Sequence, residues 1–131
     1  MTVYAYSQDQ IAKGAHLESD IVSNPTLAAA GTQNIDVEVA GVARLTILGD
    51  LTGAAIGDLA ITVQPYFGDN VTLEAVVLSP MYTPPANVVA GGHVSSYAEY
   101  DVTGLGRVRI LAKNNNAGAQ ALKVSWRTQT S

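Results

Sequence analysis

Apolar and polar residues alternate along most of the chain, and this period of two predicts β-strands rather than helices. The alternation is clearest in segments 107–113 and 121–127, which flank an Asn- and Gly-rich loop at 114–118. The shared apolar face of the two segments consists of Val108, Ile110, Ala112, Leu122, Val124 and Trp126. Because Asn and Gly tolerate positive φ, the loop can reverse the chain without strain. The pattern therefore predicts an antiparallel hairpin with one apolar and one polar face.

Six further segments follow the strand pattern. They are residues 15–22, 33–40, 42–48, 59–66, 71–78 and 93–102. We predict that 59–66 and 71–78 form a hairpin with Val71, Leu73, Ala75 and Val77 inward. Segments 33–40 and 42–48 form either a tight hairpin, which we prefer, or one strand with a bulge at Gly41.

The segments between these strands carry turn and loop signals. Asn24-Pro25 is expected to end the first strand, because proline disfavours ladder pairing. Residues 26–31 could form a helical turn, and residues 49–58 are predicted as a loop. Residues 79–92 contain three prolines and end in Gly-Gly, and a connection of this length usually crosses between sheets or contacts a partner.

Eight predicted strands and no convincing helix of ten residues place the chain in the all-β class. Strands spaced by about 8–12 residues with turns between them indicate a two-sheet antiparallel sandwich or a barrel. The long crossing makes a jelly-roll-like sandwich of about eight strands our first choice. We expect residues 1–14 to be an N-terminal arm or a short strand, and residues 15–131 to form a single β-sandwich domain.

The charge of the chain is low and unevenly distributed. Charged residues make up 14% of the sequence, against about 25% in typical domains. A low charge indicates extensive burial or a surface that meets other proteins. The net charge is −4, yet residues 106–131 contain five of the seven Lys and Arg residues and no acid. The predicted C-terminal hairpin is thus a cationic element on an acidic chain.

Catalytic and metal-binding patterns are weak. The two histidines, His16 and His93, lie on different predicted strands, and the chain has no cysteine. A catalytic triad needs a nucleophile, a histidine base and an orienting acid, and a zinc site needs three or four ligands. Two separate histidines without a cysteine do not supply either set. Asp36 and Glu38 share one strand face, but a solvated outer face explains them better than a carboxylate pair for glycoside hydrolysis. We expect no enzymatic activity, no cofactor and no bound metal.

Neither nucleic acid nor a membrane fits this chain as a partner. Trp126 falls on the apolar face, opposite the cations, so no exposed aromatic residue accompanies them for base stacking. No segment reaches the roughly 18 apolar residues of a membrane span, and the first 16 residues lack a basic segment followed by an apolar run. We expect synthesis in a cytoplasm, with neither nucleic acid nor membrane as partner. Two interpretations of the cations stay open: they block edge-to-edge strand pairing, or they meet an acidic protein surface.

The tyrosines leave a carbohydrate-binding role open. Tyr82 in the proline-rich connection and Tyr97 on the polar face of its strand are candidates for exposure. Exposed aromatic rings are platforms for sugars, but tyrosine is equally suited to protein interfaces.

Residues 100–126, YDVTGLGRVRILAKNNNAGAQALKVSW, resemble the closing strands of small virion structural proteins of tailed bacteriophages, the head decoration or cement proteins. In those proteins a turn precedes a Val-Arg-Ile strand, an Asn/Gly/Ala loop and a last apolar strand. The resemblance covers about a third of the chain. It implies a jelly-roll-like sandwich that assembles on a capsid or tail, often as a trimer, without catalysis.

The sequence thus leads to a non-enzymatic capsid decoration protein that stabilises the assembled phage head through protein–protein contacts. Its expected partners are other copies of itself, with a trimer favoured, and a major capsid or other virion protein. A carbohydrate-binding or host-adhesion sandwich is the alternative. The candidate contact residues are Arg107, Arg109, Lys113, Lys123, Arg127, Tyr82, Pro84, Pro85, Tyr4 and Tyr6.

Overall fold

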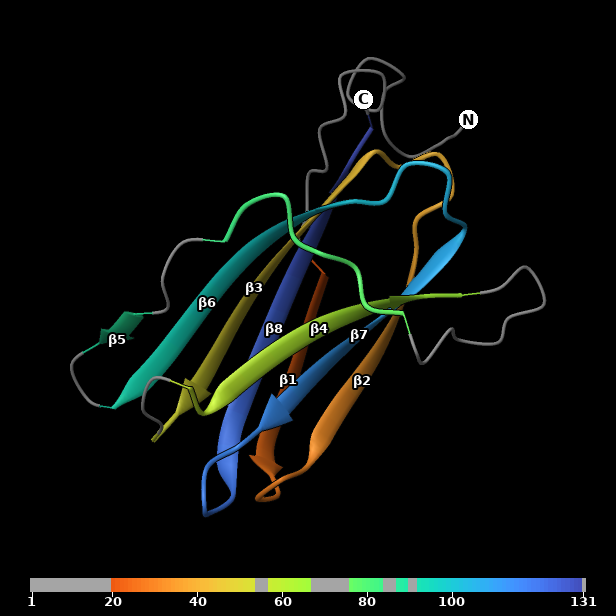
Figure 1. Ribbon diagram of the computed structural model, residues 1–131. Coiled ribbons are helices and arrows are strands. Elements are labelled where there is room, and N and C mark those ends of the chain that lie inside the picture. Colours follow the sequence, from red (N-terminus) through yellow and green to blue (C-terminus); the bar gives the residue numbers. More distant parts are fainter. Residues whose placement is uncertain (1–19, 54–56, 67–75, 84–86, 90–91, 131) are drawn as a thin grey trace.

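The computed structural model describes residues 20–53, 57–66, 76–83, 87–89 and 92–130 (Figure 1). These ranges contain strands and turns and no helix, so none of them holds a helix that could span a membrane. The strands are β1 (Asp20–Leu27), β2 (Thr32–Glu38), β3 (Arg44–Thr52), β4 (Leu59–Pro65), β5 (Asn87–Val89), β6 (His93–Asp101), β7 (Arg107–Asn114) and β8 (Gln120–Gln129).

The strands form two antiparallel sheets packed face to face, as Figure 1 shows. One sheet has the order β1-β8-β3-β6, with the short β5 added beside β6, and the other has the order β2-β7-β4. Strand β1 pairs with β8, β2 with β7 and β3 with β6. This pairing arises when a long antiparallel ribbon winds around a sandwich, which is the jelly-roll arrangement. The all-β, two-sheet prediction is confirmed.

Two of the predicted hairpins are wrong, although their strands exist. Strands β7 and β8 lie in different sheets and do not pair with each other. The same is true of β2 and β3, so neither a hairpin nor a single bulged strand forms there. Alternation identifies the face that a strand buries, but it does not identify the neighbour. Each connection between these strands is about five residues long, enough to cross the roughly 10 Å between packed sheets.

The third predicted hairpin is described only in part, because residues 67–75 lie outside the described ranges. The backbone N–H of Leu78 donates to the Val63 carbonyl over 2.8 Å, so this segment does run beside β4. Its inward residue is Leu78, which packs against the core, whereas Val77 is 52% exposed. The prediction that Val77 points inward is therefore wrong.

The connection after Leu78 crosses between the sheets, as predicted. The Met81 N–H donates to the Glu99 carbonyl, and the Glu99 N–H donates to the Tyr82 carbonyl, which joins this segment to β6. The connection then contributes β5, which pairs with β6.

Strand β1 ends later than predicted, and the first five residues of the predicted strand, 15–19, lie outside the described ranges. It continues through Asn24 and Pro25, with a register shift between Asn24 and Leu27. Proline is tolerated there because β1 is an edge strand and the ladder is irregular at this point. The expected helical turn at 26–31 is instead the end of β1 and a tight turn, in which Ala30 has a φ of 60°. Residues 1–14, the predicted arm, lie outside the described ranges.

Strand β3 is longer than predicted, because residues 49–52 continue it rather than start a loop. Gly49 faces the opposite sheet, and a Cβ atom there would lie 2.5 Å from the Ile61 Cδ1 atom. Glycine thus allows β3 and β4 to approach closely, which is why it occurs inside a strand.

The core fills the space between the two inner faces, and most of the predicted inward residues in the described ranges occupy it. The buried set includes Ile35, Val37, Val39, Leu45, Ile47, Val63, Tyr100, Val102, Val108, Ile110, Leu122, Val124 and Trp126. The prediction that Trp126 belongs to the core is confirmed, with 9% of the residue exposed.

Candidate functional site

The cations of β7 are paired with acids of the same chain. Arg109 lies opposite Asp36 on the neighbouring strand β2, with Nε 2.9 Å from Oδ1. Arg107 lies opposite Glu38 and forms an ion pair with it. Tyr66, just after β4, accepts a hydrogen bond of 2.9 Å from Arg109 Nη2, and both guanidinium groups lie within 5.6 Å of its ring centre.

These contacts compensate the charges on the outer face of the three-stranded sheet. The hydrogen bond from Arg109 lowers the pKa of Asp36, and the nearby Asp36 carboxylate raises the pKa of Tyr66. Asp36 and Glu38 are each held by an arginine, in agreement with a surface role. Arg107 and Arg109 are therefore poor candidates for contacts with an acidic partner, because their own strand neighbours already neutralise them.

The remaining predicted cations do not join them in one patch. Lys123 and Arg127 lie on β8, in the five-stranded sheet, so the C-terminal cations are divided between the two outer faces of the sandwich. Lys113 is exposed near the end of β7. Strands β7 and β8 are both flanked by other strands, so the interpretation that their cations protect a sheet edge is wrong.

An exposed apolar row crosses the outer face of the five-stranded sheet. In the strand register, Ile21 of β1 faces Ser125 of β8, Ser125 faces Leu48 of β3, and Leu48 faces Tyr97 of β6. The Tyr82 ring continues the row, edge-on to Tyr97 with 5.8 Å between the ring centres. We call Ile21, Leu48, Tyr97 and Tyr82 the apolar band.

The band is accessible along its length. Ile21 is 58% exposed, Leu48 45% and Tyr82 54%, which confirms the expected exposure of Tyr82. Tyr97 is half-buried, and its hydroxyl donates to Glu99 Oε2 over 2.5 Å, which raises the pKa of Tyr97. Alternation did not single out Ile21 or Leu48, because a single apolar residue on the polar face of a strand is common. Only the pairing of the strands shows that these residues lie in one row.

Charged groups flank the band on both sides. On β8, Lys123 and Arg127 lie two residues on either side of Ser125. In the strand register Asp50 of β3 faces Lys123, and Thr46 of β3 faces both Arg127 and Glu99 of β6, which is 3.4 Å from Arg44. Each side of the band thus carries one cation of β8 and one acid.

A polar cluster lies beside the band. The Asp50 carboxylate is hydrogen-bonded to His93 Nδ1 at 3.0 Å and accepts a hydrogen bond of 3.1 Å from the Ser95 hydroxyl. Because Ser95 donates to the carboxylate and not to the imidazole, the three residues do not form a nucleophile–base pair. Across the described ranges, no group of three His, Cys, Asp or Glu side chains could hold a metal ion. His16 lies outside those ranges.

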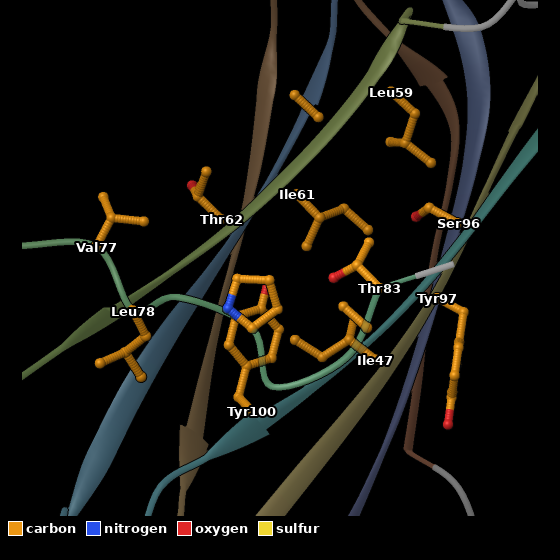
Figure 2. Close-up of a pocket in the computed structure, with 13 residues that line it drawn as sticks. Ile47, Leu59, Ile61, Thr62, Val77, Leu78, Thr83, Ser96, Tyr97 and Tyr100 are labelled. Carbon is orange, nitrogen blue, oxygen red and sulfur yellow. The ribbon is translucent and has the colours of Figure 1, made fainter. Parts of the chain in front are cut away.

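A pocket of about 390 Å³ opens between β4 and β6 (Figure 2). Apolar side chains, among them Ile47, Leu59, Ile61 and Leu78, form most of its lining, and Thr62, Thr83 and Ser96 add hydroxyl groups. Sequence periodicity could not predict it, because it lies between strands of different sheets. The other predicted contact residues, Pro84, Pro85, Tyr4 and Tyr6, lie outside the described ranges.

Comparison with models of known families and with curated proteins finds no match for this chain. Among solved structures, the chain is similar to a protein of Sulfurospirillum deleyianum, with 9% sequence identity and a TM-score of 0.51, over 88% of this chain and 100% of that one. It is also similar to the SPBc2 prophage-derived protein YomS, with 15% identity and a TM-score of 0.44, over 88% of this chain and 98% of that one. At these identities the likeness concerns the fold alone.

Proposed function

We propose that this protein is a non-enzymatic structural protein of a virus particle, a decoration protein that binds the assembled head of a tailed phage. The observation that carries the proposal is the apolar band across the five-stranded sheet. Exposed apolar residues gathered on one face of a domain mark a protein interaction site, and here Ser125 alone interrupts the row between Ile21 and Leu48. Jelly rolls occur among viral capsid and lectin domains, so the fold is compatible with the role.

The mechanism is thermodynamic linkage. A protein that binds only the assembled lattice adds its binding free energy to the stability of that lattice. The band supplies apolar contact area at the centre of the interface, and the charged groups beside it, Lys123 and Asp50 on one side and Arg127 and Glu99 on the other, fix the orientation of the partner. We also propose a homo-oligomer, with a trimer favoured as in the virion proteins that residues 100–126 resemble, made in the host cytoplasm and incorporated into the virion.

The solution mass and binding to capsid shells test the proposal. The wild-type protein is expected to have three times the chain mass of 13.6 kDa by light scattering, and to sediment with shells of the phage that encodes it. Leu48→Gln and Tyr82→Ser should weaken one or both interactions at least tenfold, because they remove apolar contacts at the interface centre.

Leu111→Gln is the matched control, since Leu111 lies on the outer face of the other sheet. It should leave both interactions unchanged. A wild-type monomer that does not bind shells would exclude the proposal. So would band variants that assemble and bind as well as the wild-type protein.

Carbohydrate binding is the second candidate. The observation in its favour is the exposed Tyr82 ring, edge-on to Tyr97, on the sheet face that also carries the Asp50, His93 and Ser95 cluster. An aromatic platform and polar side chains on one face suit a sugar ring. A glycan array with the wild-type protein and Tyr82→Ser distinguishes the two functions, because only a glycan-binding protein loses a specific array signal with this substitution.

A further inference from the structure

The pocket between β4 and β6 has the chemistry of a ligand site. Its volume of about 390 Å³ falls in the range of roughly 300–1,000 Å³ that is typical of small-molecule sites. All the residues that line it are uncharged, and most are apolar. Ile61 and Leu59 contribute from β4, Ile47 from β3, and Leu78 from the segment that runs beside β4.

The buried polar group of this pocket, the Tyr100 hydroxyl, has no hydrogen-bond partner among the residues that the structure describes. Tyr100 of β6 is 3% exposed, and Figure 2 shows its side chain directed from β6 into the pocket, towards Ile61. Burial alone raises the pKa of Tyr100, and its hydroxyl makes no hydrogen bond to another described residue. A buried hydroxyl without a hydrogen-bond partner destabilises the folded state, so such groups in native proteins generally meet a protein group, a water molecule or a ligand.

We propose that this pocket binds a small, mainly apolar molecule with one neutral hydrogen-bond acceptor, such as a ketone or an ester, and that the Tyr100 hydroxyl donates to that acceptor. The lining explains why the acceptor is neutral. A carboxylate would enter without a cation beside it, and burying an uncompensated charge is far more costly than burying a carbonyl group. This site goes beyond the proposed structural role and does not depend on it, because the buried Tyr100 hydroxyl lies between the sheets, and Tyr97 is the one residue that the pocket lining shares with the apolar band.

Calorimetric titration with 2-octanone as the probe tests the proposal. The wild-type protein should bind 2-octanone at one site per chain. Tyr100→Phe keeps the ring and removes only the hydroxyl, so its affinity should fall about tenfold, the equivalent of one hydrogen bond of about 1.4 kcal/mol. Tyr66→Phe is the matched control, because Tyr66 does not line the pocket and its hydroxyl is held by Arg109. Its affinity for 2-octanone should be unchanged.

Two further measurements complete the design. Octanoate at pH 8 should bind at least tenfold more weakly than 2-octanone, because its charge meets no cation. Ala98→Leu, which narrows the pocket from β6, should also lose binding, and it provides a second variant if Tyr100→Phe does not fold. Failure of the wild-type protein to bind 2-octanone up to its solubility limit would overturn the proposal. Equal affinity of Tyr100→Phe and the wild-type protein, or tighter binding of octanoate, would do the same.

Discussion

Replacing Asn114 with alanine is expected to destabilise the folded chain by about 3 kcal/mol. Asn114 ends β7 and is the fully buried polar residue of the described core, with 0% exposure. Its Nδ2 group lies 3.0 Å from the carbonyl oxygens of Leu27 and Gly118 and 3.3 Å from that of Ala28. Its Oδ1 atom accepts a hydrogen bond of 2.8 Å from the Asn116 N–H.

The expected magnitude follows from these contacts. Each net hydrogen bond contributes about 1 kcal/mol, and a buried group that loses its partner costs about 1–3 kcal/mol. The four contacts of the Asn114 side chain give an upper value of about 4 kcal/mol by this measure. Water that enters the vacated space can bond to the exposed carbonyl groups and so recovers part of this free energy. The loss matters for the fold because this side chain ties the turn between β1 and β2 to the connection between β7 and β8.

Urea unfolding followed by tryptophan fluorescence measures the effect. Trp126 is the single tryptophan and is 9% exposed, so unfolding shifts its emission to longer wavelength. Asn115→Ala is the matched control, since Asn115 is the next residue and is exposed. It should change the free energy of unfolding by less than about 0.5 kcal/mol. If Asn114→Ala remained within 1 kcal/mol of the wild-type protein, the structural role assigned to Asn114 would be refuted.

Two further predictions concern the surface. Asp36→Asn should lower stability at pH 7 by less than about 1 kcal/mol, because the ion pair with Arg109 is largely exposed. The pKa of Asp36 is lowered in the folded state, so its contribution is complete above the unfolded value near 3.9 and is lost as the pH falls through the folded value. Unfolding curves from pH 7 to pH 2 should therefore converge for the two proteins, and a difference that persisted at pH 2 would contradict the assignment. Gly104→Ala should destabilise the folded chain by about 1 kcal/mol, because Gly104 has a φ of 86°. Gly106→Ala should be neutral or stabilise by up to about 1 kcal/mol, because Gly106 has no positive φ and a Cβ atom there meets nothing within 4 Å. Equal melting temperatures for these two glycine variants would show that the turn does not impose the conformation at Gly104.

The strands and their inward faces could be predicted from the sequence alone. Side chains in a strand point alternately to opposite faces, so Ile35, Val37 and Val39 had to share the buried face once the strand was identified. The same reasoning placed Trp126 in the core. The class of fold followed, because strands with one apolar face must be covered by another layer.

The pairing of the strands, and with it every candidate site, was decided only by the tertiary structure. Arg109 and Asp36 are 73 residues apart and meet because β7 pairs with β2 rather than with β8. Ile21, Leu48 and Tyr82 form one band only after β1, β8, β3 and β6 are aligned in register. Alternation is a local property of one strand, whereas the choice of neighbour depends on which loops cross between sheets and on how the whole core packs, and no segment of the sequence carries that information by itself.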